Sequence, residues 1–174
     1  MIKVCIADNY PVVHFGVKSY FKDNAEISLV ANVGNFLMVR DILQTKEIDV
    51  LILDLELEGL ASIFEVKALL KNFPKTKIII FSGLSEQIYA PNAIKAGVSG
   101  FVHKSEKLET LGQSIIKVHQ GKIIMNETVK KNLALIAKQS KSERLYRKLS
   151  NREVEVLRYL SDGKKNHEIA DILK

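Results

Sequence analysis

Short apolar runs alternate with helical patterns along the first 120 residues of the chain. Between the runs, apolar residues recur every three or four positions, as Val13, Val17 and Phe21 do, which is typical of amphipathic helices. Strands are predicted near residues 2–7, 27–33, 48–53, 77–81 and 99–102. Helices are predicted near 12–23, 35–45, 60–72, 86–96 and 106–119. Pro91 predicts that the fourth helix is short or irregular.

Repeated strand and helix units predict an α/β fold, because parallel strands need crossover connections that are usually helical. For five such units we expect a flavodoxin-like, doubly wound, five-stranded parallel sheet with the strand order 2-1-3-4-5. The ligand crevice of this fold lies beyond the carboxyl ends of strands 1 and 3. Residues that follow those strands are therefore the first candidates for a functional site.

Four of the predicted strands end on polar residues that suit phosphate chemistry: Asp8, Asp54, Ser82 and Lys104. All carboxyl ends of a parallel sheet lie at one edge, so we expect these side chains to converge. Two neighbouring carboxylates repel each other, and hard oxygen ligands that retain water suit Mg²⁺. With Mg²⁺ bound, Asp54 is a plausible nucleophile toward a phosphoryl group, which Lys104 and Ser82 would stabilise by charge and hydrogen bonding.

Four segments of the chain resemble the receiver domain of two-component response regulators: Ile6–Pro11, Leu51–Leu55, Ile79–Gly83 and Gly100–Lys104. The resemblance covers about the first two thirds of the chain and implies a CheY-like receiver fold. It also implies roles for single residues. Asp54 would be the phosphoacceptor, Asp8 would belong to the metal pocket, Lys104 would bind the phosphoryl group, and Ser82 and Phe101 would form the switch.

The sequence departs from the receiver pattern beside the expected metal. Asn9 stands where the family usually has a second carboxylate, so it would be a weak ligand. Glu56 lies two residues beyond Asp54, where the resemblance implies a ligand through the backbone carbonyl. Its side chain adds an acid that could replace the missing ligand or repel a phosphodonor. The turn that is commonly Met-Pro-Gly reads Leu57-Glu58-Gly59 here.

The pattern changes after Gly121. An amphipathic helix is predicted over 125–137, followed by a polar linker over 138–143. Ser150 and Glu153 have the spacing of a capping box at the start of a further helix, Gly163 can cap its end, and a second helix is predicted over 166–173.

Leu149–Val154, with Gly163 and Glu168–Ala170, resembles the opening of the helix-turn-helix domain in NarL/FixJ (LuxR-type) regulators. The predicted domains are a receiver over 1–120, a linker with an amphipathic helix over 121–148, and the first two helices of the LuxR-type domain over 149–174. The family's recognition helix would follow Lys174, so we expect DNA binding in the full-length regulator but weak or absent binding by these residues.

Charge and composition agree with a regulator of nucleic acid. The net charge of +6 lies entirely within residues 121–174, which hold 13 Lys and Arg against 7 Asp and Glu. No segment approaches the length of a membrane span and no signal peptide precedes the first strand, so a cytoplasmic location without membrane contact is expected. Cys5 is the only cysteine, which excludes an internal disulfide and cysteine-rich metal sites.

These observations predict a response regulator, and not an enzyme, that a histidine kinase or phosphotransfer protein phosphorylates on Asp54 to control DNA binding. A homodimer is expected, with Mg²⁺ as the cofactor. Two alternatives stay open. One is a receiver that acts through protein contacts without phosphorylation, which Asn9 favours. The other is a phosphohydrolase in which Asp54 is the nucleophile and Glu56 is the acid and base.

Overall fold

A computed structural model describes residues 1–138, 150–161 and 163–173. Its centre is a five-stranded parallel sheet with the order β2-β1-β3-β4-β5, which confirms the predicted topology. The strands are β1 Ile2–Ala7, β2 Ile27–Val33, β3 Val50–Leu53, β4 Lys77–Ser82 and β5 Gly100–His103. β3 begins two residues later than predicted, and the other strands differ by one residue or less at each end.

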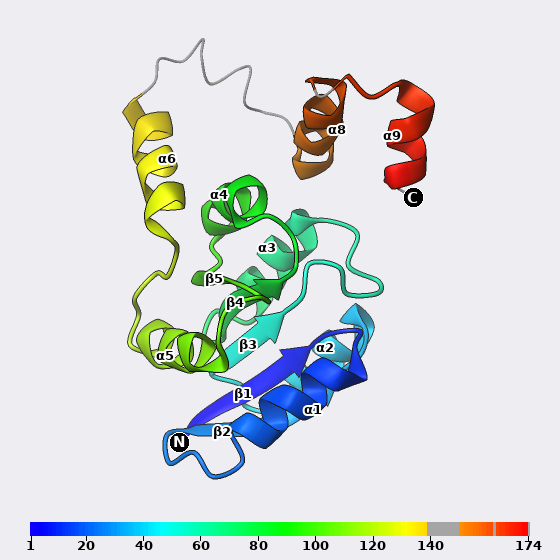
Figure 1. The fold of residues 1–174 in the computed structure, drawn as a ribbon. Helices are drawn as coiled ribbons and strands as arrows, with labels where there is room; N and C mark the ends of the chain where they lie inside the picture. Colours follow the sequence, from blue (N-terminus) through cyan, green and yellow to red (C-terminus); the bar gives the residue numbers. More distant parts are fainter. Residues whose placement is uncertain (139–149, 162, 174) are drawn as a thin grey trace.

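Helices cover both faces of the sheet (Figure 1). They are α1 Pro11–Tyr20, α2 Phe36–Thr45, α3 Ile63–Asn72, α4 Glu86–Ala96 and α5 Leu108–His119. Two apolar clusters form the core. One joins α2, α3 and α4 to residues such as Leu51 and Ile80, and the other joins α1 and α5 to residues such as Val50 and Ile79. Because the two faces are both buried, the central strands are continuously apolar and do not alternate.

The expectation from Pro91 was a short or irregular helix, and the prediction of a short α4 is wrong. The helix spans 86–96 in full, with Pro91 in its interior. Proline lacks an N–H and removes one helical hydrogen bond. Ala90 and Ala93, on either side of the proline, are both fully buried in the core, and this packing offsets the lost bond. Gly97 then ends the helix with a φ of 106°, a left-handed conformation that glycine adopts without strain.

The segment after α5 is attached to the sheet. The Ile124 N–H donates to the Ser99 carbonyl over 2.8 Å, and the Phe101 N–H donates to the Ile124 carbonyl over 3.1 Å, so Ile124 pairs with β5. Helix α6, Glu127–Lys138, then packs along α4, with Val129 completely buried in the core. The Asn126 N–H also donates to the Glu86 carboxylate at the start of α4. The first part of the predicted linker is thus built into the receiver.

Two further helices follow the part of the chain that lies outside the described residues. They are α8 Asn151–Ser161 and α9 Asn166–Ile172, which pack against each other. The predicted capping box is present: the Glu153 carboxylate accepts from the Ser150 N–H, and the Ser150 hydroxyl accepts from the Glu153 N–H. Gly163, with a φ of 78°, lies where a helix-ending glycine was predicted. The polar stretch 139–143 lies outside the described residues.

Helix α8 contacts α4 of the receiver (Figure 1). The Tyr89 hydroxyl donates to the Glu155 carboxylate over 3.0 Å, and the Arg152 guanidinium lies 3.5 Å from the same carboxylate. Burial, followed by the bond to the Glu155 carboxylate, raises the pKa of Tyr89 to about 12. This contact joins the two regions through polar groups.

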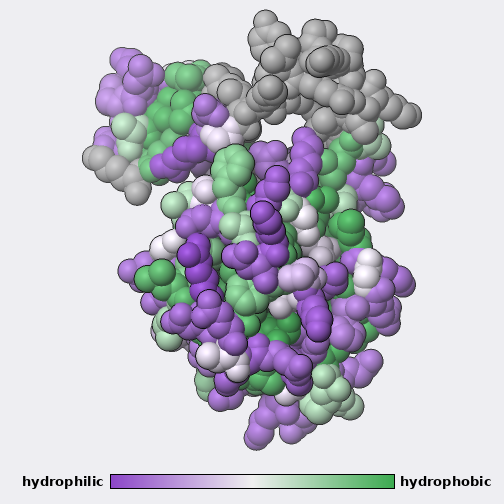
Figure 2. All heavy atoms as spheres, turned by 180° about the vertical axis from the view of Figure 1, so that it is seen from behind, coloured by the Kyte–Doolittle hydropathy of each residue, from purple (hydrophilic) through white to green (hydrophobic). Residues whose placement is uncertain are grey.

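On the face seen from behind, hydrophilic residues predominate and hydrophobic residues lie between them (Figure 2). Among the described residues, no helix is both long and apolar enough to cross a membrane.

Candidate functional site

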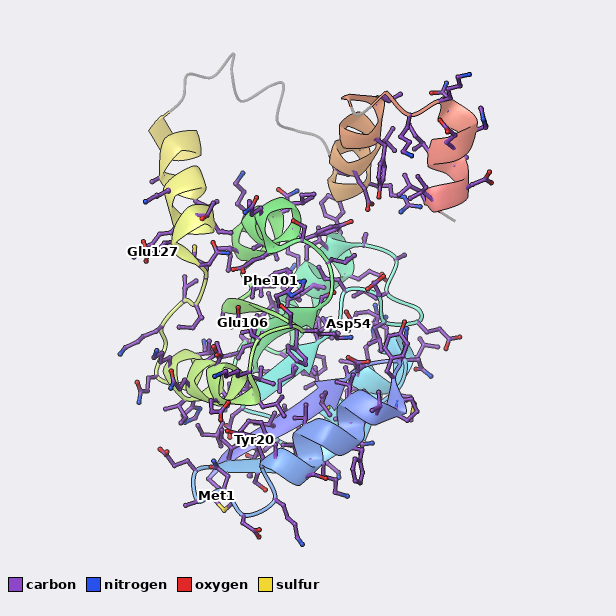
Figure 3. All side chains as sticks on the ribbon, in the orientation of Figure 1. Met1, Tyr20, Asp54, Phe101, Glu106 and Glu127 are labelled. Carbon is purple, nitrogen blue, oxygen red and sulfur yellow. The ribbon has the colours of Figure 1, made fainter. Side chains whose placement is uncertain are left out.

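The strand register brings the ends of β1, β3, β4 and β5 to one edge of the sheet. Ala7 and Leu53 are register partners, and the Asp54 N–H donates to the Ala7 carbonyl over 2.9 Å. On the other side, the Lys104 N–H donates to the Ser82 carbonyl over 2.9 Å. Backbone pairing therefore positions the main chain of all four predicted site residues at this edge of the sheet. Figure 3 shows Asp54 there.

Lys104 bridges two buried carboxylates. Its Nζ lies 2.7 Å from Asp8 Oδ2 and 2.6 Å from Asp54 Oδ2. Each aspartate is only 1% exposed. Charged groups at such depth are stable only when paired, so this three-residue group is held together by mutual neutralisation. The Tyr10 ring covers it from outside, with its centroid 5.2 Å from Lys104 Nζ.

Desolvation alone would lower the pKa of Lys104. Hydrogen bonds to Asp54 and Asp8, and the charges of both, outweigh that effect, and the pKa of Lys104 is raised. A raised value means that the ammonium stabilises the fold at all pH values below its ordinary pKa. That contribution is lost only as the pH rises through the raised pKa.

The site carries more negative than positive charge, since one ammonium faces two carboxylates. Asp8 Oδ1 accepts from the Tyr10 N–H over 2.8 Å, and Asp54 Oδ1 lies 3.3 Å from the Glu56 N–H. Within residues 1–138, 150–161 and 163–173, no cluster of three or more His, Cys, Asp or Glu side chains could hold a metal. Two carboxylates and a backbone carbonyl still fit Mg²⁺, which commonly keeps several waters.

Asn9 braces the loop that follows β3. Its Nδ2 donates to the Glu56 carbonyl over 2.6 Å, and its Oδ1 accepts from the Glu58 N–H over 2.8 Å. Asn9 was predicted to be a weak metal ligand, and the Glu56 carbonyl was predicted to be a further ligand. In the structure, the Asn9 side chain holds that carbonyl in place. The Glu56 side chain is exposed. A carboxylate at position 9 could not donate to Glu56, so asparagine here favours a preformed loop over an additional charge.

The two predicted switch residues are both buried. Ser82 is fully buried, and its hydroxyl oxygen lies 3.4 Å from the Leu84 N–H. Phe101 is 2% exposed and packs in the same apolar cluster as α3 and α4. Phe101 lies on β5 (Figure 3), and its ring is buried in this cluster.

Two residues beside the site were not among the predicted site residues. Tyr10 lies over Lys104, and His103 bonds to groups next to Ser82 and Lys104. Each is close in sequence to a predicted site residue, and this proximity was the sequence feature that could have indicated them. Neither has a spacing that sequence patterns associate with phosphate.

Comparison with known proteins now identifies the family. Residues 4–116 match the response regulator receiver domain, and residues 147–174 match the luxR family of bacterial regulatory proteins. The chain belongs to the response regulators of the luxR family. It is therefore a two-component regulator with a receiver and a DNA-binding part, as the sequence predicts.

Curated relatives and solved structures agree with this family. Fimbriae Z protein of Escherichia coli strain K12 is 31% identical over 171 residues, which cover 98% of this chain and 80% of that protein. The nitrate/nitrite response regulator protein NarP of the same strain is 28% identical, with 98% and 80% covered. RcsB of Salmonella enterica serovar Typhimurium, bound to promoter rprA with phosphomimetic BeF3⁻, is 25% identical with a TM-score of 0.69, covering 99% of this chain and 83% of that one.

Proposed function

We propose that Asp54 of this response regulator accepts a phosphoryl group from a histidine kinase or phosphotransfer protein, and that this modification controls DNA binding. The observation that supports the proposal is the bridge from Lys104 to both Asp8 and Asp54. It places a cation against the carboxylate of Asp54, the residue that directly follows β3. A phosphoryl group on Asp54 would bring new negative oxygens to this ammonium.

The transfer needs a nucleophile and a leaving group. A carboxylate oxygen of Asp54 attacks phosphorus, the phosphorus–nitrogen bond of the donor phosphohistidine breaks, and the bonding electron pair leaves with the imidazole nitrogen. Lys104 keeps its proton and pairs with the phosphoryl oxygens. The Ser82 hydroxyl oxygen accepts from the Leu84 N–H, which leaves its O–H to donate a hydrogen bond to the same phosphoryl oxygens.

We propose Mg²⁺ as the cofactor, held by the carboxylates of Asp8 and Asp54 and the backbone carbonyl of Glu56. Bound there, the ion supplies positive charge that offsets the phosphoryl oxygens. Asn9 acts on this site by fixing the Glu56 carbonyl. The chain thus provides a preformed set of oxygen ligands for Mg²⁺. Because position 9 is asparagine, this set carries one negative charge fewer than it would with a carboxylate there.

DNA and a second copy of the chain are the proposed partners of the output region. Support comes from the basic C-terminal part and from relatives: one solved structure contains two RcsB dimers bound to two parallel DNAs, and that RcsB is 25% identical to this chain. A homodimer in the cytoplasm, with DNA binding that is weak or absent for residues 1–174 alone, stays a prediction.

Incubation with acetyl phosphate and Mg²⁺ tests the phosphoacceptor. Intact mass spectrometry is expected to show one added phosphoryl group on the wild type and none on Asp54→Asn. Asp49→Asn is the matched control, because Asp49 lies just before the opposite end of β3, and it is expected to react like the wild type. Labelling of Asp54→Asn, or continuous phosphate release from many esters, would contradict the proposal.

Asn9→Asp tests the metal site separately. The extra carboxylate is expected to tighten Mg²⁺ binding about fivefold or more, because a cation site gains a negative ligand. The same change removes the hydrogen bond to the Glu56 carbonyl but keeps an acceptor for the Glu58 N–H, so amide exchange should accelerate at Glu56 more than at Glu58. Isothermal titration with Mg²⁺ and amide exchange read the two effects. Weaker Mg²⁺ binding in the variant would show that the brace matters more than the charge.

A further inference from the structure

The loops after β4 and β5 carry Ser82 and Lys104, and a single side chain connects them. His103 Nε2 lies 3.0 Å from the Gly83 carbonyl, and Nδ1 lies 2.6 Å from the Ser105 hydroxyl and 3.2 Å from the Ser105 N–H. Gly83 directly follows Ser82, and Ser105 directly follows Lys104. The imidazole therefore joins the two residues next to the proposed phosphate-binding groups.

The partners determine the tautomer of the ring. A carbonyl only accepts, so Nε2 must carry the hydrogen that goes to Gly83. A backbone N–H only donates, so Nδ1 must be the acceptor for Ser105. The neutral Nε2–H tautomer satisfies all of these contacts at once.

The position of the ring extends the sheet. The ladder between β4 and β5 ends at the pair Ser82 and His103, and the Lys104 N–H still donates to the Ser82 carbonyl. Beyond that bond the two strands separate into loops. The hydrogen bond from the His103 ring continues the connection between the strands for one more residue, to the Gly83 carbonyl. Gly83 is exposed, and beyond its chain neighbours no atom of the described residues lies within 4 Å of the position that a Cβ would occupy there.

We propose that His103 is a positioning residue that clamps the Ser82 loop to the Lys104 loop, so that both groups face one phosphoryl group at a fixed spacing. The inference rests on the proposed phosphorylation of Asp54. Preorganised donors bind a charged group better than donors that must first be ordered. Without the clamp, the loop after Ser82 would have to be fixed at the moment of binding, which weakens the complex.

Three substitutions separate the two arms of the clamp. The side-chain nitrogen of His103→Gln can reach the place of Nε2 and restore the bond to Gly83. The side-chain oxygen of His103→Asn can replace Nδ1 toward Ser105 but is too short to reach Gly83. His103→Leu fills similar space and restores neither. His119→Leu is the matched control, because His119 is an exposed histidine at the end of α5.

Two measurements decide the proposal. Amide exchange of Lys104 is expected to accelerate about fivefold in the Leu and Asn variants and to return close to the wild-type rate in the Gln variant, the effect of one net hydrogen bond. Fluoroberyllate affinity, measured in Mg²⁺ by titration calorimetry, is expected to fall about fivefold in the same two variants and to recover in the Gln variant.

The outcomes are distinct. If the Leu variant matches the wild type in both measurements, or recovers as well as the Gln variant, His103 only fills space and the proposal is overturned. If exchange changes but affinity does not, the clamp exists and does not position phosphate, which also overturns the proposal. If the wild type does not bind fluoroberyllate, the proposed function fails. If Lys104 amide exchange is also equal in all variants, the proposal that His103 clamps the two loops is overturned as well.

Discussion

The receiver region and the helical region after residue 150 hold their shape in different ways. The receiver buries two continuous apolar clusters on either side of a sheet, and its charges meet at one edge. The two described helices beyond it pack against each other and meet the receiver through polar groups on α8 and α4. Most of the stabilising apolar burial therefore lies in the receiver. The helices after residue 150 are attached to it by polar contacts that contribute little free energy and are easily broken.

The largest expected effect comes from removing core volume. Leu51 is fully buried in the centre of the sheet, and Leu51→Ala is expected to lower the free energy of unfolding by about 2–5 kcal/mol. Ile169, 4% exposed in α9, lies in the other region, and Ile169→Ala should change the main unfolding transition by less than about 0.5 kcal/mol. Urea denaturation followed by circular dichroism measures both. Equal losses would show that the two regions unfold as one unit.

Removing the cation at the sheet edge is expected to be the next largest effect. Lys104→Met leaves Asp8 and Asp54 buried without their partner, at a cost of about 1–3 kcal/mol. Millimolar Mg²⁺ should restore part of this loss, because the ion neutralises the same carboxylates. Thermal melts with and without Mg²⁺ provide the test. A variant as stable as the wild type in chelator would mean that the carboxylates need no cation.

Alkaline pH probes the sheet through Cys5. Burial raises the pKa of this thiol to about 12 from an ordinary value of 9.0. The folded state then holds its proton more tightly than the unfolded state, so stability is complete below pH 9.0 and falls as the pH rises toward 12. The slope from this group approaches about 1.4 kcal/mol per pH unit. Urea titrations of Cys5→Ala at several pH values should show a shallower decline, and an unchanged slope would contradict the assignment.

The smallest expected effect lies at the junction of the regions. Tyr89→Phe removes the hydrogen bond to Glu155, worth about 0.5–1.5 kcal/mol, and leaves the ring in place. Amide exchange in α8 should accelerate severalfold, whereas the receiver's unfolding transition should not move. If the exchange of α8 stayed constant, the contact between α8 and α4 would not depend on this bond.

The fold was largely predictable because its signals are local. Apolar runs marked the strands, and the capping box at Ser150 and Glu153 marked the start of α8. Pro91 misled because a proline's local cost was weighed without the buried Ala90 and Ala93 that hold α4 in place. Propensity is a weak guide where tertiary packing decides.

The site was predictable as a list of residues and not as a set of bonds. Strand ends indicated Asp8, Asp54, Ser82 and Lys104, because topology alone brings strand ends to one edge. Asn9 braces Glu56 across 47 positions of sequence and Glu58 across 49. His103 reaches Gly83 across 20. Such hydrogen bonds depend on loop conformations that no periodic pattern encodes.

The pairing of Ile124 with β5 determines where this receiver can be cut. A piece that ends at residue 120 would leave the Phe101 N–H and the Ser99 carbonyl without their partners. It would also expose the part of the apolar cluster that Val129 covers. Open strand edges recruit strands from other molecules. Such a shortened protein would leave these groups of β5 open to pairing with another molecule, whereas one that keeps residues 121–138 would retain its own partner for them.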